Sequence, residues 1–128
     1  MKNKRLLIID DEERIRELVQ ICLQQLGGWD TIAADTSKDA LEIAKAQFVD
    51  AILLDVSMPD MSGLIVYEEL QANPHTQSIP IILLTAKVLP SDLTRFAQMK
   101  IAGIITKPFK ALTLAQEIAQ ILGWDDKC

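Results

Sequence analysis

Five short apolar runs, rich in β-branched residues, alternate along this chain with longer segments of helical periodicity. The runs cover residues 6–9, 29–34, 51–54, 79–84 and 101–106, and the helical segments cover residues 12–26, 37–48, 63–72, 91–100 and 111–122. Strands that are apolar on both faces and separated by amphipathic helices predict a parallel sheet covered on both sides by right-handed crossovers. We therefore expect a doubly wound α/β fold with five strands and five helices.

The length and composition are those of one globular domain. The chain has 128 residues, of which 49% are hydrophobic and 24% charged, and no Pro/Gly/Ser-rich run marks a linker. This length suffices to bury a core without disulfides or metals. We expect residues 1–128 to form a single domain with no output domain attached.

The charge balance bears on the kind of partner. Thirteen basic and eighteen acidic side chains give a net charge of −5, which lacks the positive surface that binding to a phosphate backbone requires. The sequence thus argues against direct binding of DNA or RNA. The apolar run before Asp10 is too short for a signal-peptide core or a membrane span. We expect a cytoplasmic protein.

Isolated cysteine, histidine and tryptophan residues define no site of their own. Cys22 falls on the apolar stripe of the first predicted helix and Cys128 is far from it in sequence, so we expect neither a disulfide nor a metal cluster. His75, the only histidine, is interpreted as an exposed loop residue rather than a phosphorelay donor. Trp29 and Trp124 are interpreted as packing at the domain edge.

Reactive polar residues follow four of the five predicted strands. They are Asp10 and Asp11 after the first, Asp55 after the third, Thr85 after the fourth, and Thr106 and Lys107 at the end of the fifth. The carboxyl ends of parallel strands meet at one edge of a sheet, where the ligands of open α/β sheets bind. We expect these side chains to converge in one crevice.

Three carboxylates in one crevice repel each other and raise each other's pKa unless a cation neutralises them. Oxygen ligands suit Mg²⁺, which takes one or two protein carboxylates together with water and phosphate oxygens. Phosphoryl transfer requires a positioned nucleophile, a metal, and cationic or hydrogen-bonding groups for the remaining oxygens. The pattern predicts that Asp55, Mg²⁺, Lys107 and Thr85 fill these roles.

Each of these residues also has a structural interpretation. The acidic residues 10–13 can cap a helix and complement its dipole. Asp55 and Thr85 can bond within their own turns, and Lys107 can be a solvated surface amine. These separate interpretations do not explain why all the residues follow strands at the same end, so the joint pattern favours function.

Four motifs carry a resemblance to a known family over residues 5–122. They are Leu6-Leu7-Ile8-Ile9-Asp10-Asp11-Glu12, Asp55-Val56-Ser57-Met58-Pro59-Asp60-Met61-Ser62-Gly63, Leu83-Leu84-Thr85-Ala86-Lys87 and Thr106-Lys107-Pro108-Phe109. The chain resembles the response-regulator receiver domains of two-component signalling, also called chemotaxis-protein-like domains. The resemblance implies a flavodoxin-like sheet with strand order 2-1-3-4-5. We expect a stand-alone receiver, since no output domain follows the fifth predicted helix.

The resemblance also implies a metal and a phosphorylation site. Asp55 would be the phosphoacceptor and a ligand of Mg²⁺, which Asp11 would bind directly, Asp10 largely through water and Ser57 through its backbone carbonyl. A histidine kinase or phosphotransfer protein would be the phosphodonor. The protein would be a signalling switch rather than an enzyme, catalysing only its own aspartyl phosphorylation and dephosphorylation.

Thr85 and Lys107 would bind phosphoryl oxygens by the same resemblance, and the bond between Lys107 and Pro108 would be cis. In the family, movement of the threonine and of an aromatic residue on the fifth strand reshapes the face formed by the fourth helix, fifth strand and fifth helix. Here Ile104 stands where the family usually has Tyr or Phe, and isoleucine lacks the ring and the hydroxyl. The sequence leaves open how the signal leaves the domain.

Further implications of the resemblance concern lifetime and assembly. Ser57 and Lys87 would flank the path of the water that attacks the phospho-aspartate. The chain would be a monomer or a weak dimer through the face formed by the fourth helix, fifth strand and fifth helix. The downstream protein partner is left open.

Other classes of protein compete with this interpretation. An interaction module that works without phosphorylation is suggested by Ile104 and opposed by the complete set of predicted site residues. A flavodoxin-like electron carrier needs a loop rich in free N–H donors after the first strand, where this chain has the acidic residues 10–13. A phosphohydrolase resembling haloacid dehalogenase usually has a second aspartate two residues after the nucleophile, where this chain has Ser57.

Overall fold

A five-stranded parallel sheet forms the centre of the molecule, with strand order β2-β1-β3-β4-β5. The computed structural model describes residues 4–10, 12–56, 63–85, 94, 96–107 and 109–124, with only the backbone at 63 and 64. The strands are β1 (Arg5–Ile9), β2 (Asp30–Ala34), β3 (Ala51–Asp55), β4 (Ile81–Thr85) and β5 (Gly103–Thr106). The predicted doubly wound fold and its strand order are confirmed.

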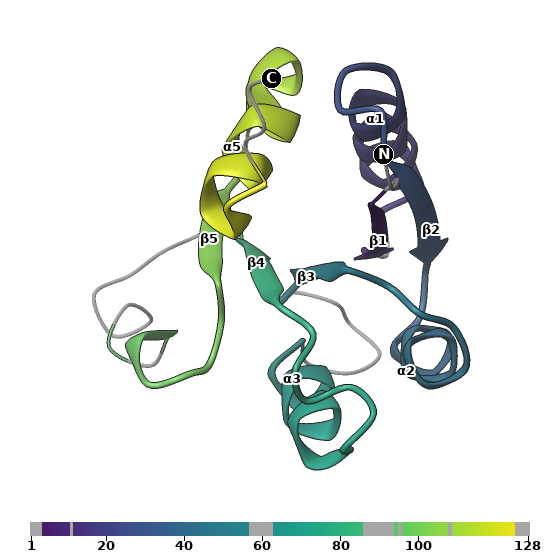
Figure 1. Ribbon diagram of the computed structural model, residues 1–128, viewed down its shortest axis with the longest axis vertical. Helices are drawn as coiled ribbons and strands as arrows, with labels where there is room; N and C mark the ends of the chain where they lie inside the picture. Colours follow the sequence, from purple (N-terminus) through teal and green to yellow (C-terminus); the bar gives the residue numbers. More distant parts are fainter. Residues whose placement is uncertain are drawn as a thin grey trace.

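Helices cover both faces of this sheet. They are α1 (Glu13–Gln25), α2 (Ser37–Ala46), α3 (Gly63–Ala72) and α5 (Leu114–Leu122), the last preceded by the 3₁₀ turn η1 (Ala111–Thr113). Figure 1 shows α1 and α5 on one face and α2 and α3 on the other. The fourth predicted helix, residues 91–100, falls largely outside the described residues, and within it Thr94, Phe96 and Ala97 are helical.

The core has two layers because side chains alternate across each strand. Leu6 and Ile8 of β1 belong to the cluster under α1 and α5, while Leu7 and Ile9 belong to the cluster under α2 and α3. All four are at most 1% exposed, and burying one such side chain contributes roughly 1.5–3 kcal/mol. The buried Cys22 of α1 packs in the first layer, as predicted.

The cluster under α2 and α3, here called the α3-side cluster, contains residues from every strand. Its buried members are Leu7, Ile9, Ala34, Ala40, Ala44, Val49, Ile52, Leu54, Val66, Leu70, Ile81, Leu83 and Phe96, and the half-buried residues against it include Ile32, Val56, Tyr67, Ile79, Met99, Ile101 and Ile104. This cluster therefore connects β3, α3 and β5 without interruption.

Two strand starts differ from the sequence prediction. β4 begins at Ile81 rather than residue 79, and β5 begins at Gly103 rather than residue 101. Ile79 and Ile101 pack against the α3-side cluster, but the Ile79 N–H donates to the Thr76 carbonyl in a turn at 3.1 Å. An apolar residue can thus join the core without joining the ladder of the sheet.

Glycine at the start of β5 allows α5 to lie against the strand. A Cβ atom at Gly103 would meet Cγ2 of Ile121 at 2.8 Å, which is closer than packed carbon atoms approach. The α5 helix ends where Gly123 adopts a left-handed conformation with φ of 73°, a conformation that glycine accepts without steric cost. These two glycines set the position and the end of α5.

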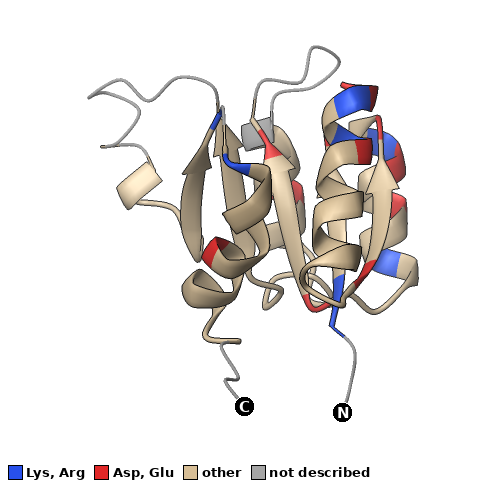
Figure 2. Ribbon diagram, turned by 90° about the horizontal axis from the view of Figure 1, so that it is seen from above, with Lys and Arg blue, Asp and Glu red and all other residues tan. Residues whose placement is uncertain are grey.

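Register places the carboxyl ends of the strands together. Asp55 lies opposite Leu84, and Thr85 lies opposite Thr106. In Figure 2 the arrowheads of the strands all point to the same edge of the molecule. Asp10, Asp55, Thr85 and Lys107 therefore lie at one edge of the sheet, called the carboxyl edge below.

Candidate functional site

Three polar residues at the carboxyl edge are buried. Asp10 follows β1 and is 0% exposed, Asp55 ends β3 and is 1% exposed, and Thr85 ends β4 and is 4% exposed. The Asp10 N–H donates to the Ala34 carbonyl at 3.3 Å, which extends the pairing of β1 with β2 by one residue. The sheet thus holds two carboxyl groups away from bulk water.

Lys107 supplies the positive charge for these carboxyl groups. Its Nζ lies 3.3 Å from Oδ2 of Asp10, 3.3 Å from Oδ2 of Asp55 and 3.3 Å from Oε1 of Glu12. The bonds to Asp55 and Glu12 have hydrogen-bond geometry. The backbone N–H of Lys107 donates to the Thr85 carbonyl at 2.8 Å, so pairing with β4 fixes the point from which the ammonium reaches inward.

Glu12 is a site residue that the sequence analysis missed. The sequence analysis included it in an acidic run and in the first family motif but gave it no role, yet its carboxylate bonds to Lys107 across 95 residues of sequence. Glu12 is also more open to solvent than the others, with 61% of its side chain exposed. Its place in the acidic run at the edge where Lys107 was expected is the signal that could have found it.

Ionisation of the Asp10 carboxyl group is electrostatically unfavourable. Oδ1 accepts a hydrogen bond from the Glu12 N–H at 2.9 Å, whereas the buried Oδ2 has no hydrogen-bond partner among the described residues. The pKa of Asp10 is raised from 3.8 to about 6, mainly by burial and also by the Asp55 charge, while the Glu12 hydrogen bond and Lys107 oppose the shift. Near neutral pH, Asp10 is poised to exchange its charge for a proton or a cation.

Lys107 remains a cation in this surrounding. Burial lowers the pKa of its ammonium, but the charges of Asp55 and Asp10 outweigh burial, so the pKa is raised above its usual value of 10.5. One ammonium therefore faces three carboxyl groups, and the site carries net negative charge when all three are ionised. This charge favours binding of a further cation.

The donor set fits a hard divalent cation such as Mg²⁺. Asp10 and Asp55 offer carboxylate oxygens, and Oδ2 of Asp10 is buried and lacks a hydrogen bond within the described part of the chain. The described residues contain no group of three His, Cys, Asp or Glu side chains placed to hold a metal. Mg²⁺ needs only one or two protein carboxylates because water fills its other positions. Asp11 and Ser57, the other predicted ligands, lie outside the described residues.

The predicted switch residues lie on neighbouring strands. Thr85 ends β4, and Ile104 of β5 lies opposite Leu83 and packs against the α3-side cluster. Thr106, which ends β5, is exposed. Lys87 and Pro108 lie outside the described residues. The predicted cis bond before Pro108 lies outside them as well.

The residues set aside in the sequence analysis lie away from the carboxyl edge. His75 is exposed in a turn, where its backbone N–H donates to Oδ1 of Asn73 at 2.8 Å. Trp29 and Trp124 pack edge to face with ring centroids 5.2 Å apart. These positions agree with the interpretation of His75 as a loop residue and of both tryptophans as packing residues.

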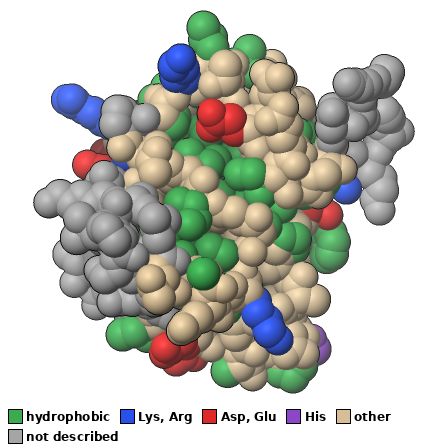
Figure 3. Space-filling view, turned by 90° about the vertical axis from the view of Figure 1, so that its left-hand side faces the viewer, with side chains coloured by type: hydrophobic (Ala, Val, Ile, Leu, Met, Phe, Trp, Pro, Cys, Tyr) green, Lys and Arg blue, Asp and Glu red, His purple; other side chains and the backbone are tan. Residues whose placement is uncertain are grey.

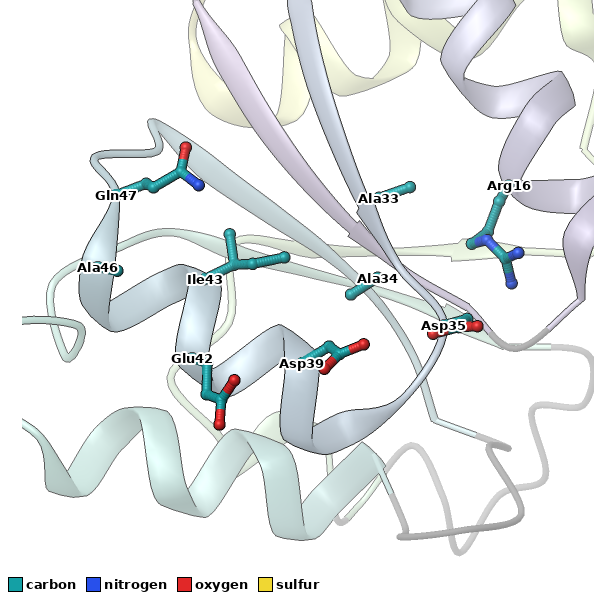
Figure 4. Close-up of a pocket in the computed structure, with 9 residues that line it drawn as sticks. All are labelled: Arg16, Ala33, Ala34, Asp35, Asp39, Glu42, Ile43, Ala46 and Gln47. Atoms are coloured by element: carbon teal, nitrogen blue, oxygen red, sulfur yellow. The ribbon is translucent and has the colours of Figure 1, made fainter.

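A cavity of about 570 Å³ lies beside the site, between β2 and α2. Figure 4 shows that the Arg16 guanidinium extends toward Asp35 at its rim. Arg16 also donates from Nη1 to the backbone carbonyl of Asp10 at 3.0 Å. The other lining charges are the carboxylates of Asp39 and Glu42. Arg16 thus links this cavity to the site, and we assign it no ligand.

The fold and site together define the class of protein. The family model of the response regulator receiver domain matches residues 6–119 of this chain. The chain therefore belongs to the response regulator receiver family, whose members act in two-component signalling.

Relatives of known identity include bacterial chemotaxis proteins. The chain is 32% identical over 120 residues to the chemotaxis protein CheY-3 of Vibrio cholerae, which covers 94% of this chain and 92% of the relative. It is 28% identical over 117 residues to the chemotaxis protein CheY of Pseudomonas aeruginosa, covering 91% of this chain and 94% of the relative. The similarity thus extends over nearly the whole of both chains.

Solved structures give the same result. The chemotaxis protein CheY4 of Vibrio cholerae superposes with a TM-score of 0.86 at 27% identity, over 94% of this chain and 99% of the other. The receiver domain of a Pseudomonas aeruginosa sensor histidine kinase, described with a magnesium ion coordinated in its active site cleft, gives 0.83 at 26% identity over 95% and 99%. None of the described helices combines the length and apolarity needed to span a bilayer.

Proposed function

We propose that the protein is a phospho-accepting switch in which Asp55 takes a phosphoryl group from the phosphohistidine of a histidine kinase or phosphotransfer protein. The observation that carries this proposal is the ammonium of Lys107 at 3.3 Å from Oδ2 of both Asp55 and Asp10. A buried ion pair on its own adds little stability. Once a divalent cation offsets the carboxylates, a buried ammonium at this ligand-binding edge is suited to an incoming phosphoryl group.

The chemistry follows from the positions of the groups. A carboxylate oxygen of Asp55 attacks phosphorus, a bond from that oxygen to phosphorus forms, and the bond from phosphorus to the histidine nitrogen breaks with its electron pair leaving on the imidazole. The Lys107 ammonium, already beside Asp55, then forms an ion pair with a phosphoryl oxygen. The Thr85 hydroxyl donates a hydrogen bond to another.

Asp10 and Asp55, with Asp11 and the Ser57 carbonyl, would hold Mg²⁺, and the bound ion neutralises the carboxylates and the transferring phosphoryl oxygens. Oδ2 of Asp10, which is buried and has the Lys107 ion pair but no hydrogen bond among the described residues, and the raised pKa of Asp10 support this assignment from the chain itself. The kinase receiver domain described with magnesium in its cleft supports it from a structural neighbour. The backbone N–H of Glu12 holds the Asp10 carboxyl group in place through a hydrogen bond to Oδ1.

Turnover of an external substrate is not part of this proposal. The protein catalyses only the phosphorylation of Asp55 and the loss of that phosphoryl group. Its product is a changed surface, so its partners are the phosphodonor and a downstream protein. We place these reactions in the cytoplasm, where kinase and receiver meet.

The output surface in this proposal is the face around β5 and α5. A groove of about 660 Å³ lies there, with Ile104, Phe109 and Ile121 among its apolar lining residues and Gln116, Glu117 and Gln120 among its polar ones. Figure 3 shows hydrophobic side chains gathered in the middle of this face. Ile104 both lines this groove and packs on the α3-side cluster, so it is placed to pass a change from Thr85 to a protein partner or to a second copy in a weak dimer.

The test is the intact mass of the protein after incubation with acetyl phosphate, with and without Mg²⁺. We expect one labile phosphoryl adduct on the wild type that requires Mg²⁺ and is absent from Asp55→Asn. Asp35→Asn, which removes an exposed carboxylate beside the site, is the matched control and should keep the adduct. A folded wild-type protein that binds Mg²⁺ and takes no phosphoryl group would instead favour an interaction module that works without phosphorylation.

A further inference from the structure

A hydrogen bond joins α3 to the segment that precedes β5. The backbone N–H of Lys100 donates to the phenol oxygen of Tyr67 at 2.5 Å, across 33 residues of sequence. Tyr67 is the only tyrosine in the chain, and no sequence motif singled it out. This contact therefore ties two elements that the sheet does not pair directly.

Lys100 lies between two segments whose backbones are held by hydrogen bonds. The Met99 N–H donates to the Phe96 carbonyl at 3.0 Å, closing a turn on one side of Lys100. The Ala102 N–H donates to the Ile81 carbonyl at 2.7 Å, which attaches the other side to β4. The Lys100 amide is thus the group between the helical residues 94–97 and β5, and Tyr67 fixes where the segment turns.

The ring of Tyr67 belongs to the cluster that connects the phosphoacceptor strand with β5. Val56, which directly follows Asp55, and Ile104 of β5 are half-buried against the same α3-side cluster. The cluster is close-packed, so displacement on one side moves its neighbours rather than filling empty space. Tyr67 is therefore in the apolar unit that a change at Asp55 would disturb.

The inference addresses the missing aromatic residue of β5. Ile104 has no hydroxyl with which to exchange hydrogen bonds between two states. Tyr67 has both the ring and the hydroxyl. It lies on α3, packs on the same cluster as Ile104, and bonds to the segment that precedes β5. A single hydrogen bond of this kind biases a two-state equilibrium by roughly two- to tenfold, which is a useful amount for a switch.

We propose that Tyr67 is a positioning residue of the switch: its hydroxyl holds the Lys100 amide in the unphosphorylated state, and phosphorylation of Asp55 releases it. This inference rests on the proposed phosphorylation of Asp55. Because the bond favours the resting state, its removal shifts the population toward the state that accepts the phosphoryl group. A tyrosine with only a structural role would change stability and leave that population unchanged.

The experiment follows the Lys100 amide by NMR hydrogen exchange in ¹⁵N-labelled protein, beside the intact mass. We expect wild-type Lys100 to be protected without phosphodonor and to exchange roughly two- to tenfold faster after acetyl phosphate and Mg²⁺. Tyr67→Phe keeps the ring and should show fast exchange from the start. Its phosphorylation by acetyl phosphate should be faster than wild type by a similar factor.

Thr76→Val is the matched control. The buried Thr76 hydroxyl donates to the Leu70 carbonyl at 2.6 Å and, more weakly, to the Asn73 carbonyl at 3.4 Å. This variant therefore also loses side-chain hydrogen bonding beside α3 but none to Lys100. It should keep the wild-type exchange of Lys100 and the wild-type phosphorylation rate. Equal effects from Thr76→Val and Tyr67→Phe would mean general loosening of α3 and would overturn the proposal.

The mass measurement separates the two proposals. A phosphoryl adduct on Asp55 with unchanged exchange at Lys100 overturns the role of Tyr67 and leaves the function of Asp55 standing. No adduct on the wild type overturns the proposed function and the switch role of Tyr67 with it. A Tyr67→Phe variant that is phosphorylated at the wild-type rate also contradicts the positioning role.

Discussion

The two edges of the sheet differ in how well their charged groups are partnered. At the carboxyl edge, one ammonium faces Asp10, Asp55 and Glu12, and a buried oxygen of Asp10 lacks a hydrogen bond among the described residues. At the opposite edge, where the strands begin, Lys4 lies 5.1 Å from the centroid of the Trp124 ring, and Trp124 packs against Trp29.

Carboxyl groups show the same difference. Asp50, just before β3, accepts a hydrogen bond from the Arg5 N–H at 2.8 Å, so this carboxylate of the opposite edge is partnered by backbone. The raised pKa of Asp10 shows that ionising it costs free energy in the folded state. The comparison teaches that the carboxyl edge is arranged for a ligand that is added later, while the other edge is already complete and stabilises the fold.

Removal of Lys107 should have the largest effect on stability. Lys107→Met leaves Asp10 and Asp55 buried without their counter-charge, and we expect a loss of about 3 kcal/mol in the free energy of unfolding at pH 7 in EDTA. Urea titration followed by circular dichroism measures this loss, and added Mg²⁺ should restore part of it. Lys110→Met, which removes a nearby exposed ammonium, should change stability little. An equal loss in the free energy of unfolding in both variants would show that the buried charges of the carboxyl edge have no special effect on stability, and would contradict the distinction between the edges.

Loss of Trp124 should weaken the opposite edge without touching the chemistry. Trp124 is half-buried against the layer under α1 and α5, so Trp124→Ala should cost about 2 kcal/mol through lost packing and lost ring contacts. Trp124→Phe should cost less because a ring remains. The Mg²⁺ affinity and the rate of phosphorylation by acetyl phosphate, measured well below the melting temperature, should equal those of wild type. A changed rate in the folded variant would show that the edges are coupled.

Neutralisation of Asp10 should stabilise the metal-free protein, by about 1 kcal/mol at pH 7 in EDTA. The raised pKa of Asp10, about 6 against 3.8 when unperturbed, means that its ionisation opposes folding above pH 6 and that this cost disappears as the pH falls toward 4. The gain in Asp10→Asn is smaller than the full shift implies because Lys107 loses a partner. Urea titrations at pH 7 and pH 4.5 measure the difference in the free energy of unfolding, which should be clearly smaller at the lower pH.

Asp50→Asn is the comparison from the other edge. Because Asp50 already accepts a backbone hydrogen bond, this change should give no gain at pH 7. Stabilisation by Asp50→Asn, or equal stabilities of wild type and Asp10→Asn at pH 7, would contradict the view that unfavourable charge is confined to the carboxyl edge.

Most of the fold could be predicted from periodicity, because a parallel sheet buried on both faces leaves a strong apolar signal in each strand. The starts of β4 and β5 were wrong by two residues. Ile79 and Ile101 have the composition of strand residues and pack on the core, and sequence cannot distinguish packing from ladder pairing. Hydrogen bonds such as that from Ile79 to Thr76 decide the boundary.

The convergence of Asp10, Asp55, Thr85 and Lys107 was also predictable, because parallel strands bring their carboxyl ends together by necessity. The contacts of helical side chains were not. Arg16 on Asp10 and Tyr67 on Lys100 depend on the rotation of a helix about its own axis and on side-chain reach. Neither quantity is set by the spacing of apolar residues alone.

The distance in sequence between Lys107 and its carboxylates has a consequence for biosynthesis. Lys107 is separated from Asp55 by 52 residues and from Glu12 by 95, and it follows β5, the last strand to leave the ribosome. Asp10 and Asp55 lie at the ends of β1 and β3, which pair directly with each other. A nascent chain that has emerged only as far as β4 can therefore align the two acids before their neutralising amine has been translated. Addition of β5 completes the sheet and, in the same step, places the Lys107 ammonium beside both acids, which partly offsets their repulsion.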